Sequence, residues 1–480
     1  MTVSIWVIIG MCITFTAMIV VGLIAMKKVK SSEDFTVSGR RSTAIMVAGA
    51  IVGTCIGSGA TIGTAQTAFT IGIVGWWQTL GLSIGVLILG LVLAQVVYKR
   101  KVDTVPQILE EKYGSLIRPL TAIFSAVAIF FSILSQTKGF LPLLQSITPV
   151  SIITASVICV GLSVAFVVFG GIFASSLGGL VKTGIIIGSC VIAGVISVIA
   201  LGGFAGITTR FEFHPWLNLF ARGVGNDLAI GLGFVLGVLV TQVYIQAILS
   251  AKDAKAARNG AILASIFTMP VGLLAVSVGL YMNQFHPDIV PSQALPLFML
   301  NNFNPIIAGI FIGGLMLAAL GSNSGLIFGV STMLSRDVYK RVRSKASDKE
   351  MIMVLRLLII AIAILAGTFA VTRAGELIQT FIFLSFGMRT TVFLVPMLFT
   401  FYYKGRLTKA AGIAAVLAGP LVNIIWNLFI KQIPVSEGTI QAWIFGLDPI
   451  YTGLFAALAA FIIANIVAIH KEDNQAKAEA

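Results

Sequence analysis

Charged residues are scarce in this sequence, and acidic residues are the scarcest of them. Asp and Glu number 18 and Lys and Arg 32, so that charged residues make up 10% of the 480 residues and hydrophobic residues 58%. Soluble domains carry about 25% charged residues, because most of their surface faces water. A soluble chain this apolar would expose large hydrophobic patches. The composition therefore excludes an ordinary soluble protein and predicts a protein embedded in a lipid bilayer.

Cysteine and histidine are also few, with four and three residues. All four cysteines fall in apolar stretches, which is unlike the disulfide framework of a small secreted protein. The histidines lie in predicted loops, without metal-ligand spacing. A membrane enzyme would need a catalytic pair or a metal cluster at membrane depth, and no Asp, Glu or His is expected there. A phosphate-binding loop that ends in Lys-Ser or Lys-Thr is missing too. We therefore expect neither catalysis nor any cofactor besides a coupling ion.

Long hydrophobic runs dominate the sequence instead. A helix that crosses the bilayer needs about 20 mostly apolar residues, and this measure predicts thirteen spans. They are 4–26, 44–66, 70–98, 117–144, 149–170, 178–203, 229–250, 260–283, 304–333, 351–371, 377–402, 410–430 and 450–469. The first run is too long for a signal-peptide core and is interpreted as a retained helix. Residues 103–113 are expected to form a short amphipathic helix on the membrane surface.

The basic residues alternate between the two sides of these spans. With the N-terminus outside, the inner loops and ends hold 25 of the 32 Lys and Arg residues. Basic residues mark the cytoplasmic side of membrane proteins. We therefore predict a multi-pass protein of the plasma membrane, with its N-terminus outside and its C-terminus inside. The net charge of +14 is then a signal of topology, and we expect the lipid bilayer and a small solute as partners, with no nucleic acid and no obligate protein partner.

Two spans contain glycine-rich centres that predict breaks. Gly53–Gly63 holds four glycines with interleaved hydroxyl residues, and a stretch of this kind can unwind and offer free carbonyl groups to a cation. Close packing of helices through small residues is the alternative. The seventh span has Gly231, Gly233 and Gly237 before Thr241-Gln242. Glycine-interrupted helices at matching positions of two halves point to the binding site of an inverted-repeat transporter.

The spacing of these helices predicts a division of the chain, although no direct similarity between the halves is visible. The predicted parts are an extra helix with a cytoplasmic loop (1–43), a first five-helix repeat (44–203), an outer loop (204–228), a second five-helix repeat (229–402), and two further helices with a cytoplasmic tail (403–480). The ninth span also carries hydroxyl groups between Ala318 and Gly325. These hydroxyl groups either complete a cation site or donate hydrogen bonds to backbone carbonyl groups of their own helix.

Several of these stretches resemble the sodium:solute symporter family, which includes the sodium–glucose, proline, pantothenate and sialic acid transporters. The similar stretches are Phe35–Arg40, Gly57–Ala65, Gly170-Gly171, Gln242–Gln246 with Ala251–Ala257, and Ala318–Tyr339. The resemblance implies an all-α membrane protein of the LeuT type, with two inverted five-helix repeats, one helix before them and two after them. It also implies a cation-coupled symporter that imports a small organic solute by alternating access. A channel would need filter loops or charged rings, and neither is visible.

The family's sodium ligands, carried over residue by residue, fall on two helices. They are the carbonyl groups of Gly53, Ile56 and Ala318 and the hydroxyl positions Gly321 and Ser322. Gly321 has no hydroxyl group, so one expected ligand is missing.

The fifth core helix departs from the family as well, because Gly178-Gly179 replaces the usual Thr-Asp and Lys182 stands nearby. A lysine in an apolar environment can bind and release a proton, so Lys182 could stand in for the sodium ion. Alternatively, its side chain extends to water at the cytoplasmic end of the helix. We expect Na⁺ as the coupling ion and keep H⁺, carried by Lys182, as the alternative.

Arg389 is the clearest substrate candidate, because it lies about twelve residues into the span 377–402. Charged groups inside a membrane are costly and point to function, and a guanidinium group suits a carboxylate. A structural bond to carbonyl groups at a helix end is the alternative. Lys138 could attract an anion or extend to water. Further lining residues implied by the resemblance are Ser58, Thr61, Trp77, Gln78, Ser132, Gln136, Phe234 and Thr268. Gly237 and Val238 stand where the family has gating aromatic residues.

Overall fold

The computed structural model describes residues 4–26, 41–100, 105–170, 177–433 and 446–479, and within these residues the fold is helical without a β-strand. In this described part of the chain, nine helices are long and apolar enough to cross a membrane, and two bent helix pairs add one span each. Two shorter apolar helices, Ile5–Ala17 and Ile152–Val167, belong to α1 and α9. Together they account for the thirteen expected spans.

The helices follow one another in the expected order. The first six spans are α1 (Ile5–Met26), the bent pair α3 (Ala44–Cys55) and α4 (Thr64–Ile71), the pair α5 (Trp77–Ile88) and α6 (Ala94–Arg100), α8 (Ile117–Ile147), α9 (Ile152–Gly170) and α10 (Leu177–Ala200). The remaining spans are the bent pair α12 (Val224–Val240) and α13 (Gln242–Leu249), then α14 (Ala254–Phe285), α16 (Pro305–Met333), α18 (Asp348–Thr372), α19 (Ile378–Tyr402), α20 (Lys409–Leu428) and α22 (Pro449–Glu479). Short helices between them are α7 (Val105–Tyr113), α11 (Gly203–Arg210), α15 (Ala294–Asn302) and α17 (Lys340–Val342).

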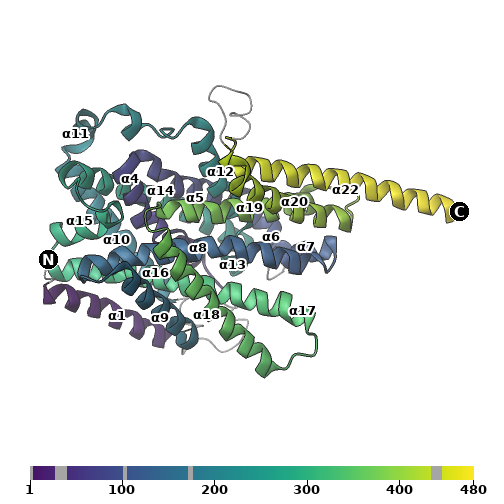
Figure 1. Ribbon diagram of the computed structural model, residues 1–480, viewed down its shortest axis with the longest axis horizontal. Helices are drawn as coiled ribbons and strands as arrows, with labels where there is room; N and C mark the ends of the chain where they lie inside the picture. The colour runs from purple at the N-terminus through teal and green to yellow at the C-terminus, as the bar shows by residue number, and fades with distance from the viewer. Residues whose placement is uncertain (1–3, 27–40, 101–104, 171–176, 434–445, 480) are drawn as a thin grey trace.

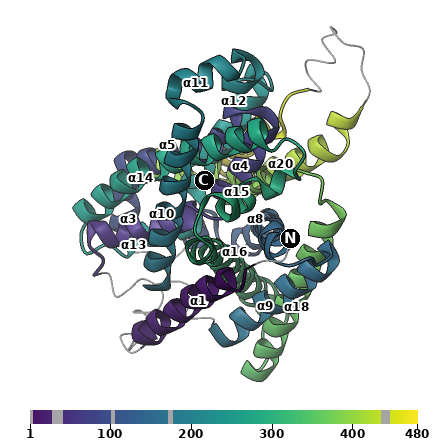
Figure 2. The same cartoon turned by 90° about the vertical axis from the view of Figure 1, so that its left-hand side faces the viewer.

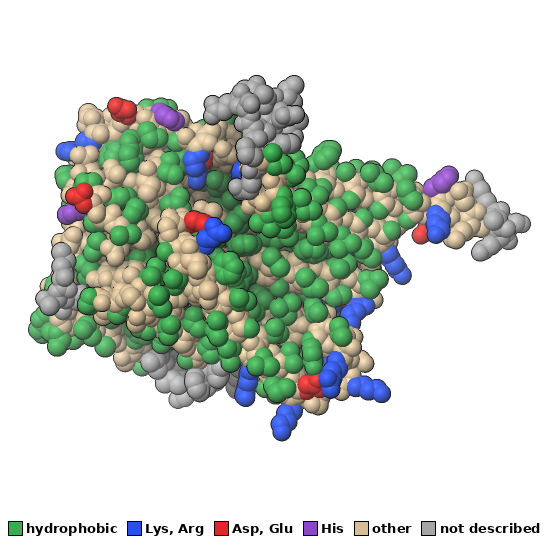
Figure 3. All heavy atoms as spheres, in the orientation of Figure 1, with side chains coloured by type: hydrophobic (Ala, Val, Ile, Leu, Met, Phe, Trp, Pro, Cys, Tyr) green, Lys and Arg blue, Asp and Glu red, His purple; other side chains and the backbone are tan. Residues whose placement is uncertain are grey.

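The spans lie side by side and give the molecule two distinct ends (Figure 1). One end carries α11 and α15, and the opposite end carries α7 and α17; we call them the α15 end and the α7 end. The surface between them is largely hydrophobic, and Lys and Arg side chains gather at the α7 end (Figure 3). Exposed side chains such as Ile192, Ile266 and Ile463 belong to this apolar belt. A belt of this kind is what lipid tails require of a membrane protein.

The two glycine-rich centres are broken, as predicted. The helix axis bends by 63° between α3 and the segment Gly59–Ile71, which begins with the π-helical turn η2 (Gly59–Gly63). The glycines permit close approach: a Cβ atom on Gly57 would lie 2.7 Å from the side-chain amide group of Gln136, and one on Gly59 would lie 2.8 Å from the side-chain amide group of Gln78. Side chains there would push the neighbouring helices away. The break is therefore built into the sequence.

The second break lies between α12 and α13, whose axes differ by 45°. Thr241 sits at the junction with an extended backbone (φ −82°, ψ 119°), and its hydroxyl donates to the carbonyl of Gly237 at 2.7 Å. Non-helical backbone at membrane depth is tolerated only inside the protein or along a cavity. Both breaks consequently mark the interior region where a solute or an ion could bind.

The other helices surround this region in two groups (Figure 2). The scaffold helices α8, α9, α16 and α18 pack on one another, and α14 packs on α3, α4, α5 and α10. Helix α19 contacts both α8 and α12, while α1 lies along α16. Helix α10 packs against both α3 and α16.

One sequence expectation is corrected at the C-terminus. His470 was expected in a loop after residue 469 but lies in α22, which continues to Glu479. The added turns are rich in Ala, Glu, Lys and Gln, which have high helix propensity. Arg406 also holds them, because it pairs with Glu472 at 2.8 Å and Asp473 at 2.7 Å. Polar residues thus extend the helix beyond its apolar span.

Candidate functional site

The first break is surrounded by buried amide side chains. The Ser58 hydroxyl donates to Oε1 of Gln136 at 2.6 Å, and the Ser58 backbone N–H donates to the same oxygen at 3.2 Å. With its amide oriented to satisfy both neighbours, Gln78 donates to the Gly59 carbonyl at 2.9 Å and accepts from the Ala60 N–H at 3.1 Å. Helices α5 and α8 therefore hold the unwound backbone of the first break through two of the predicted lining residues.

Arg389 lies beside the second break and is only 5% exposed. Its guanidinium donates to the hydroxyl groups of Thr241 (3.2 Å), Ser132 (2.6 Å) and Ser385. The ring of Phe386 lies 4.7 Å from the guanidinium carbon. Nε of Arg389 is buried without a hydrogen-bond partner, and no ion pair of this residue occurs in the described chain. A buried guanidinium thus has hydroxyl groups as its hydrogen-bond partners, and its Nε nitrogen has no partner.

The two clusters are parts of one site. Ser132 and Gln136 are one helical turn apart on α8, so they point from the same face. Phe386 also touches Phe234, with ring centroids 5.4 Å apart. A Cβ atom on Gly237 would meet the Phe386 ring at 2.7 Å. Gly237 therefore makes room for the Phe386 ring of α19, which packs against Phe234 of α12.

Three predicted lining residues have other partners. Trp77 donates through Nε1 to the carbonyl of Leu219 at 2.7 Å and meets Phe220 edge-on, so it anchors the loop after α11. Thr61 donates to the Gly57 carbonyl at 3.0 Å and Thr268 to the Ala264 carbonyl at 2.8 Å. These bonds stabilise local backbone. Their roles in solute binding stay predictions.

The five candidate ion positions lie on α3 with its break and on α16. Ile56 and Ala318 are buried, and Gly53 and Ser322 are half-buried. A Cβ atom on Gly321 would meet no atom within 4 Å. Ile56 ends α3 with a non-helical backbone (φ −96°, ψ 82°), which releases carbonyl groups from the regular helical pattern. Gly178, Gly179 and Lys182 lie in the first turns of α10, where nothing is described of the Lys182 side chain. Phe35–Arg40 and Gly171 fall outside the described residues.

Lys138 is buried and bonded to backbone carbonyl groups, so its side chain does not extend to water. It is 5% exposed, and Nζ donates to the backbone carbonyls of Arg373 and of Glu376 (2.8 Å) in the turn between α18 and α19. Cations are favourable at helix C-termini, where carbonyl groups lack partners. The bond to helix-end carbonyls that the sequence suggested for Arg389 is therefore made by Lys138.

Two glutamines that were not expected from the sequence, Gln66 and Gln379, join the broken helix to α19. Nε2 of Gln379 donates to Oγ1 of Thr64 (2.9 Å) and to the carbonyl of Gly75 (2.8 Å). Oε1 of Gln66 accepts from the Ile378 N–H at 3.1 Å. The sequence signal that could have identified these residues is a neutral amide side chain within an apolar span, because a buried polar group needs a hydrogen-bond partner. These bonds tie α4 and the following 3-10 turn η3 (Ile73–Trp76) to α19 toward the α15 end.

Similar proteins are known over most of the chain. The model of the sodium:solute symporter family matches residues 35–419. The osmoregulated proline transporter of Bacillus subtilis is 25% identical over 97% of this chain and 94% of that protein. The high-affinity proline transporter of the same organism is 26% identical over 85% of this chain and 89% of its own length. A sodium/proline symporter of Staphylococcus aureus is 25% identical over 94% of this chain and 91% of that protein.

Solved structures show the same fold. A Na⁺-coupled sialic acid symporter in a substrate-bound outward-open state superposes with a TM-score of 0.73, at 16% identity, over 96% of this chain and 97% of that one. Mhp1, a nucleobase-cation-symport-1 family transporter, superposes with a TM-score of 0.57 at 14% identity, over 91% of this chain and 95% of that one. The fold is thus the expected LeuT type, and because the family model covers most of the sequence, the chain belongs to the sodium:solute symporter family.

Proposed function

We propose that this symporter imports a small organic solute that carries a carboxylate group, and that Arg389 binds that group. The supporting observation is the buried guanidinium held by the hydroxyl groups of Thr241, Ser132 and Ser385. A buried charge without a counter-ion is costly. A solute carboxylate would supply the missing charge and accept from the unused Nε donor. Arginine favours such paired, planar hydrogen bonds.

The relatives agree with this chemistry. The curated relatives are named as transporters of proline, an amino acid with a carboxylate group. Within the described spans, no Asp or Glu contacts Arg389, so a cationic solute would meet only repulsion there. Lys138 already has carbonyl partners and leaves Arg389 as the unpaired interior cation among the described side chains. A purely structural Arg389, which fixes the second break through Thr241, is the competing explanation.

We further propose sodium as the coupling ion. Family membership supports it, and the non-helical backbone at Ile56 can offer carbonyl oxygen to a cation without any particular side chain. Backbone carbonyls at broken helices coordinate Na⁺ in transporters of this architecture. Proton coupling through Lys182 remains the alternative. The division at residues 44–203 and 229–402 into two repeats is part of the same proposal, because each block begins with one broken helix.

A panel of solutes tests the proposal directly. In proteoliposomes with a sodium gradient, we expect uptake of labelled carboxylates and zwitterionic amino acids, proline first. The matching amides and esters should be taken up at least tenfold more slowly, because they lack the anionic group. Equal uptake of an acid and its amide would contradict the assignment of Arg389.

Orientation can be tested by labelling. We propose that the α7 end faces the cytoplasm, because basic residues gather there (Figure 3), and cytoplasmic loops carry Lys and Arg. In a variant without native cysteines, a membrane-impermeant thiol reagent should label a cysteine at Ser292 in intact cells. A cysteine at Ser344 should react only after permeabilisation. Ser344 is chosen because it is exposed, whereas the side chain of the nearby Ser347 caps α18 and should be kept. The reverse pattern would invert the topology.

A further inference from the structure

We infer that the first turns of α18 form a binding site for the phosphate group of an anionic phospholipid. The lipid belongs to the leaflet at the α7 end, and Arg356 and Lys349 hold its phosphate group from one face of the helix. The inference does not depend on the solute or on the coupling ion, because it concerns a surface of the protein that faces the bilayer.

Arg356 lies on an exposed face of α18 that is otherwise apolar. Ile352 and Ile360 are four residues before and after it and are 51% and 44% exposed, and the adjacent Leu357 is 59% exposed. Residues four apart on a helix share one face. Exposed apolar side chains on a membrane-spanning helix contact lipid tails, which are as apolar as leucine. Arg356 is itself exposed, so its side chain lies among residues that face lipid.

No protein group neutralises this cation. In the part of the chain that the structure describes, neither Arg356 nor the exposed Lys349 has a hydrogen bond or an ion pair. A charged group inside a bilayer is costly unless it reaches a partner or the membrane surface. The guanidinium of Arg356 therefore needs an anion from outside the protein.

The position of Arg356 along α18 places it near the boundary between lipid tails and headgroups. The helix Asp348–Thr372 has 25 residues and is about 37 Å long, which exceeds the hydrocarbon thickness of about 30 Å. Arg356 lies about 12 Å along the helix from Asp348. Long basic side chains extend from such a depth to the membrane surface. The phosphate groups of the lipids lie at that level.

Lys349 extends the same site toward water. It precedes Arg356 by about two helical turns, or roughly 10 Å along the axis, so both side chains project from one face. A guanidinium group binds phosphate through paired hydrogen bonds, and an ammonium group adds a second charge. Asp348 is the nearest acidic residue in the sequence, but adjacent residues of a helix project from different faces. The two cations thus match a phosphate group with little competition from the protein.

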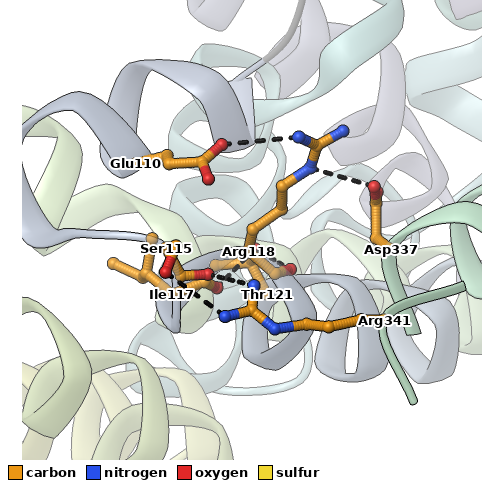
Figure 4. Close-up of polar contacts among 7 residues, drawn as sticks. All are labelled: Glu110, Ser115, Ile117, Arg118, Thr121, Asp337 and Arg341. Carbon is orange, nitrogen blue, oxygen red and sulfur yellow. Dashed lines mark hydrogen bonds and ion pairs between the residues drawn. The ribbon is translucent and has the colours of Figure 1, made fainter. Parts of the chain in front are cut away.

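Other basic residues at the α7 end differ, because protein groups hold them (Figure 4). Arg118 at the start of α8 donates to Asp337 at 2.9 Å and pairs with Glu110 of α7 at 3.4 Å. Arg341 of α17 donates to the carbonyl of Ser115 at 2.7 Å. These contacts explain the positions of both arginines within the protein. The two cations of α18 have no such contacts.

The turn before α18 favours an anionic lipid over a zwitterionic one. Lys345 is exposed in this turn, and Val342 is 86% exposed, so a basic and an apolar side chain are both available to a membrane surface. Basic residues beside a membrane attract anionic lipids. A zwitterionic headgroup carries its own ammonium group, which Lys345 and Lys349 would repel. Phosphatidylglycerol supplies the phosphate group without that ammonium group.

Quenching by labelled lipids tests the site where it lies. In a variant without native cysteines, a bimane fluorophore is attached after Met353→Cys, because Met353 is 56% exposed near Arg356. The protein is placed in phosphatidylcholine vesicles that contain nitroxide-labelled phosphatidylglycerol or nitroxide-labelled phosphatidylcholine. The ratio of the two quenching constants gives the preference for the anionic lipid. Ile463→Cys on α22 is the matched control position, since Ile463 is 62% exposed and no Lys or Arg lies within seven residues of it in the sequence.

We expect a preference for phosphatidylglycerol of about tenfold at position 353 and of less than about twofold at position 463, because each basic residue near a membrane surface adds about fivefold in attraction. Arg356→Gln should lower the preference at position 353 by about fivefold. The double variant with Lys349→Gln should lose it, and Arg356→Lys should keep part of it. Arg406→Gln is the control at the same end and should change nothing, since Arg406 pairs with Glu472 and Asp473.

Equal quenching by the two lipids at position 353 of the otherwise unchanged protein would overturn the inference, and so would a preference that the double variant keeps. Inorganic phosphate, compared with chloride at the same ionic strength, should not reduce the preference further. A preference that disappears with phosphate alone would assign the site to a soluble anion and refute the lipid assignment. The measurement uses neither solute nor an ion gradient, so its failure is distinguishable from a failure of the proposed function.

Discussion

Replacement of Arg389 by Gln is expected to abolish concentrative uptake of the solute. Loss of one partner of a buried charged pair costs about 2–5 kcal/mol, which corresponds to roughly 30-fold to several thousand-fold in affinity. Arg389→Lys should give an intermediate loss, because an ammonium group keeps the charge but not the paired planar donors. Equilibrium binding of the labelled solute to the purified protein measures both effects.

The folded protein should survive both Arg389 substitutions. Arg389 has hydroxyl partners that can bond to one another, and Ser132 already donates to Ser385 at 2.7 Å. Removal of the guanidinium also relieves the cost of a buried charge. Arg373→Gln is a suitable control, because this exposed side chain pairs with Glu376 at 2.9 Å near the α15 end. If both Arg389 variants bind as tightly as the parent, the residue is structural and the solute needs no carboxylate.

The second large effect concerns the coupling ion. We expect uptake to follow an imposed sodium gradient and to fall to background without sodium. Ser322→Ala should raise the sodium concentration for half-maximal uptake by about tenfold, because it removes the hydroxyl at the one candidate position that has one. Hydrogen bonds or ion contacts of charged groups contribute about 1.5–3 kcal/mol. Lys182→Ala should then change little.

Proton coupling predicts the opposite pattern. A pH gradient alone would drive uptake in sodium-free buffer, and Lys182→Ala would lose the dependence on pH while Ser322→Ala kept normal transport. Separately imposed sodium and pH gradients in proteoliposomes distinguish the two. Uptake that continues without sodium under a constant pH gradient would refute the sodium assignment.

The sequence by itself determined the spans and the positions of their breaks. Span length depends on a local run of apolar residues, and the bilayer sets the length that is needed. The breaks depend on glycines that are close together, so Gly57, Gly59 and Gly237 were visible without any contact. Residues 103–113 were likewise recognisable from local pattern, and α7 forms within them as Val105–Tyr113.

Only the tertiary structure decided which polar side chains meet. Ser132 and Ser385 are 253 positions apart in the chain and Gln242 and Val105 are 137 apart, yet each pair is hydrogen-bonded. Sequence spacing cannot show such pairs, because the rotation of each helix about its axis depends on packing with several others. For the same reason, the sequence could not show which of the two interior cations bonds to helix-end carbonyl groups. In the structure Lys138 makes these bonds after α18, and Arg389 bonds to hydroxyl groups. In an apolar interior each buried donor must find an acceptor, and the fold alone determines which acceptors lie within reach.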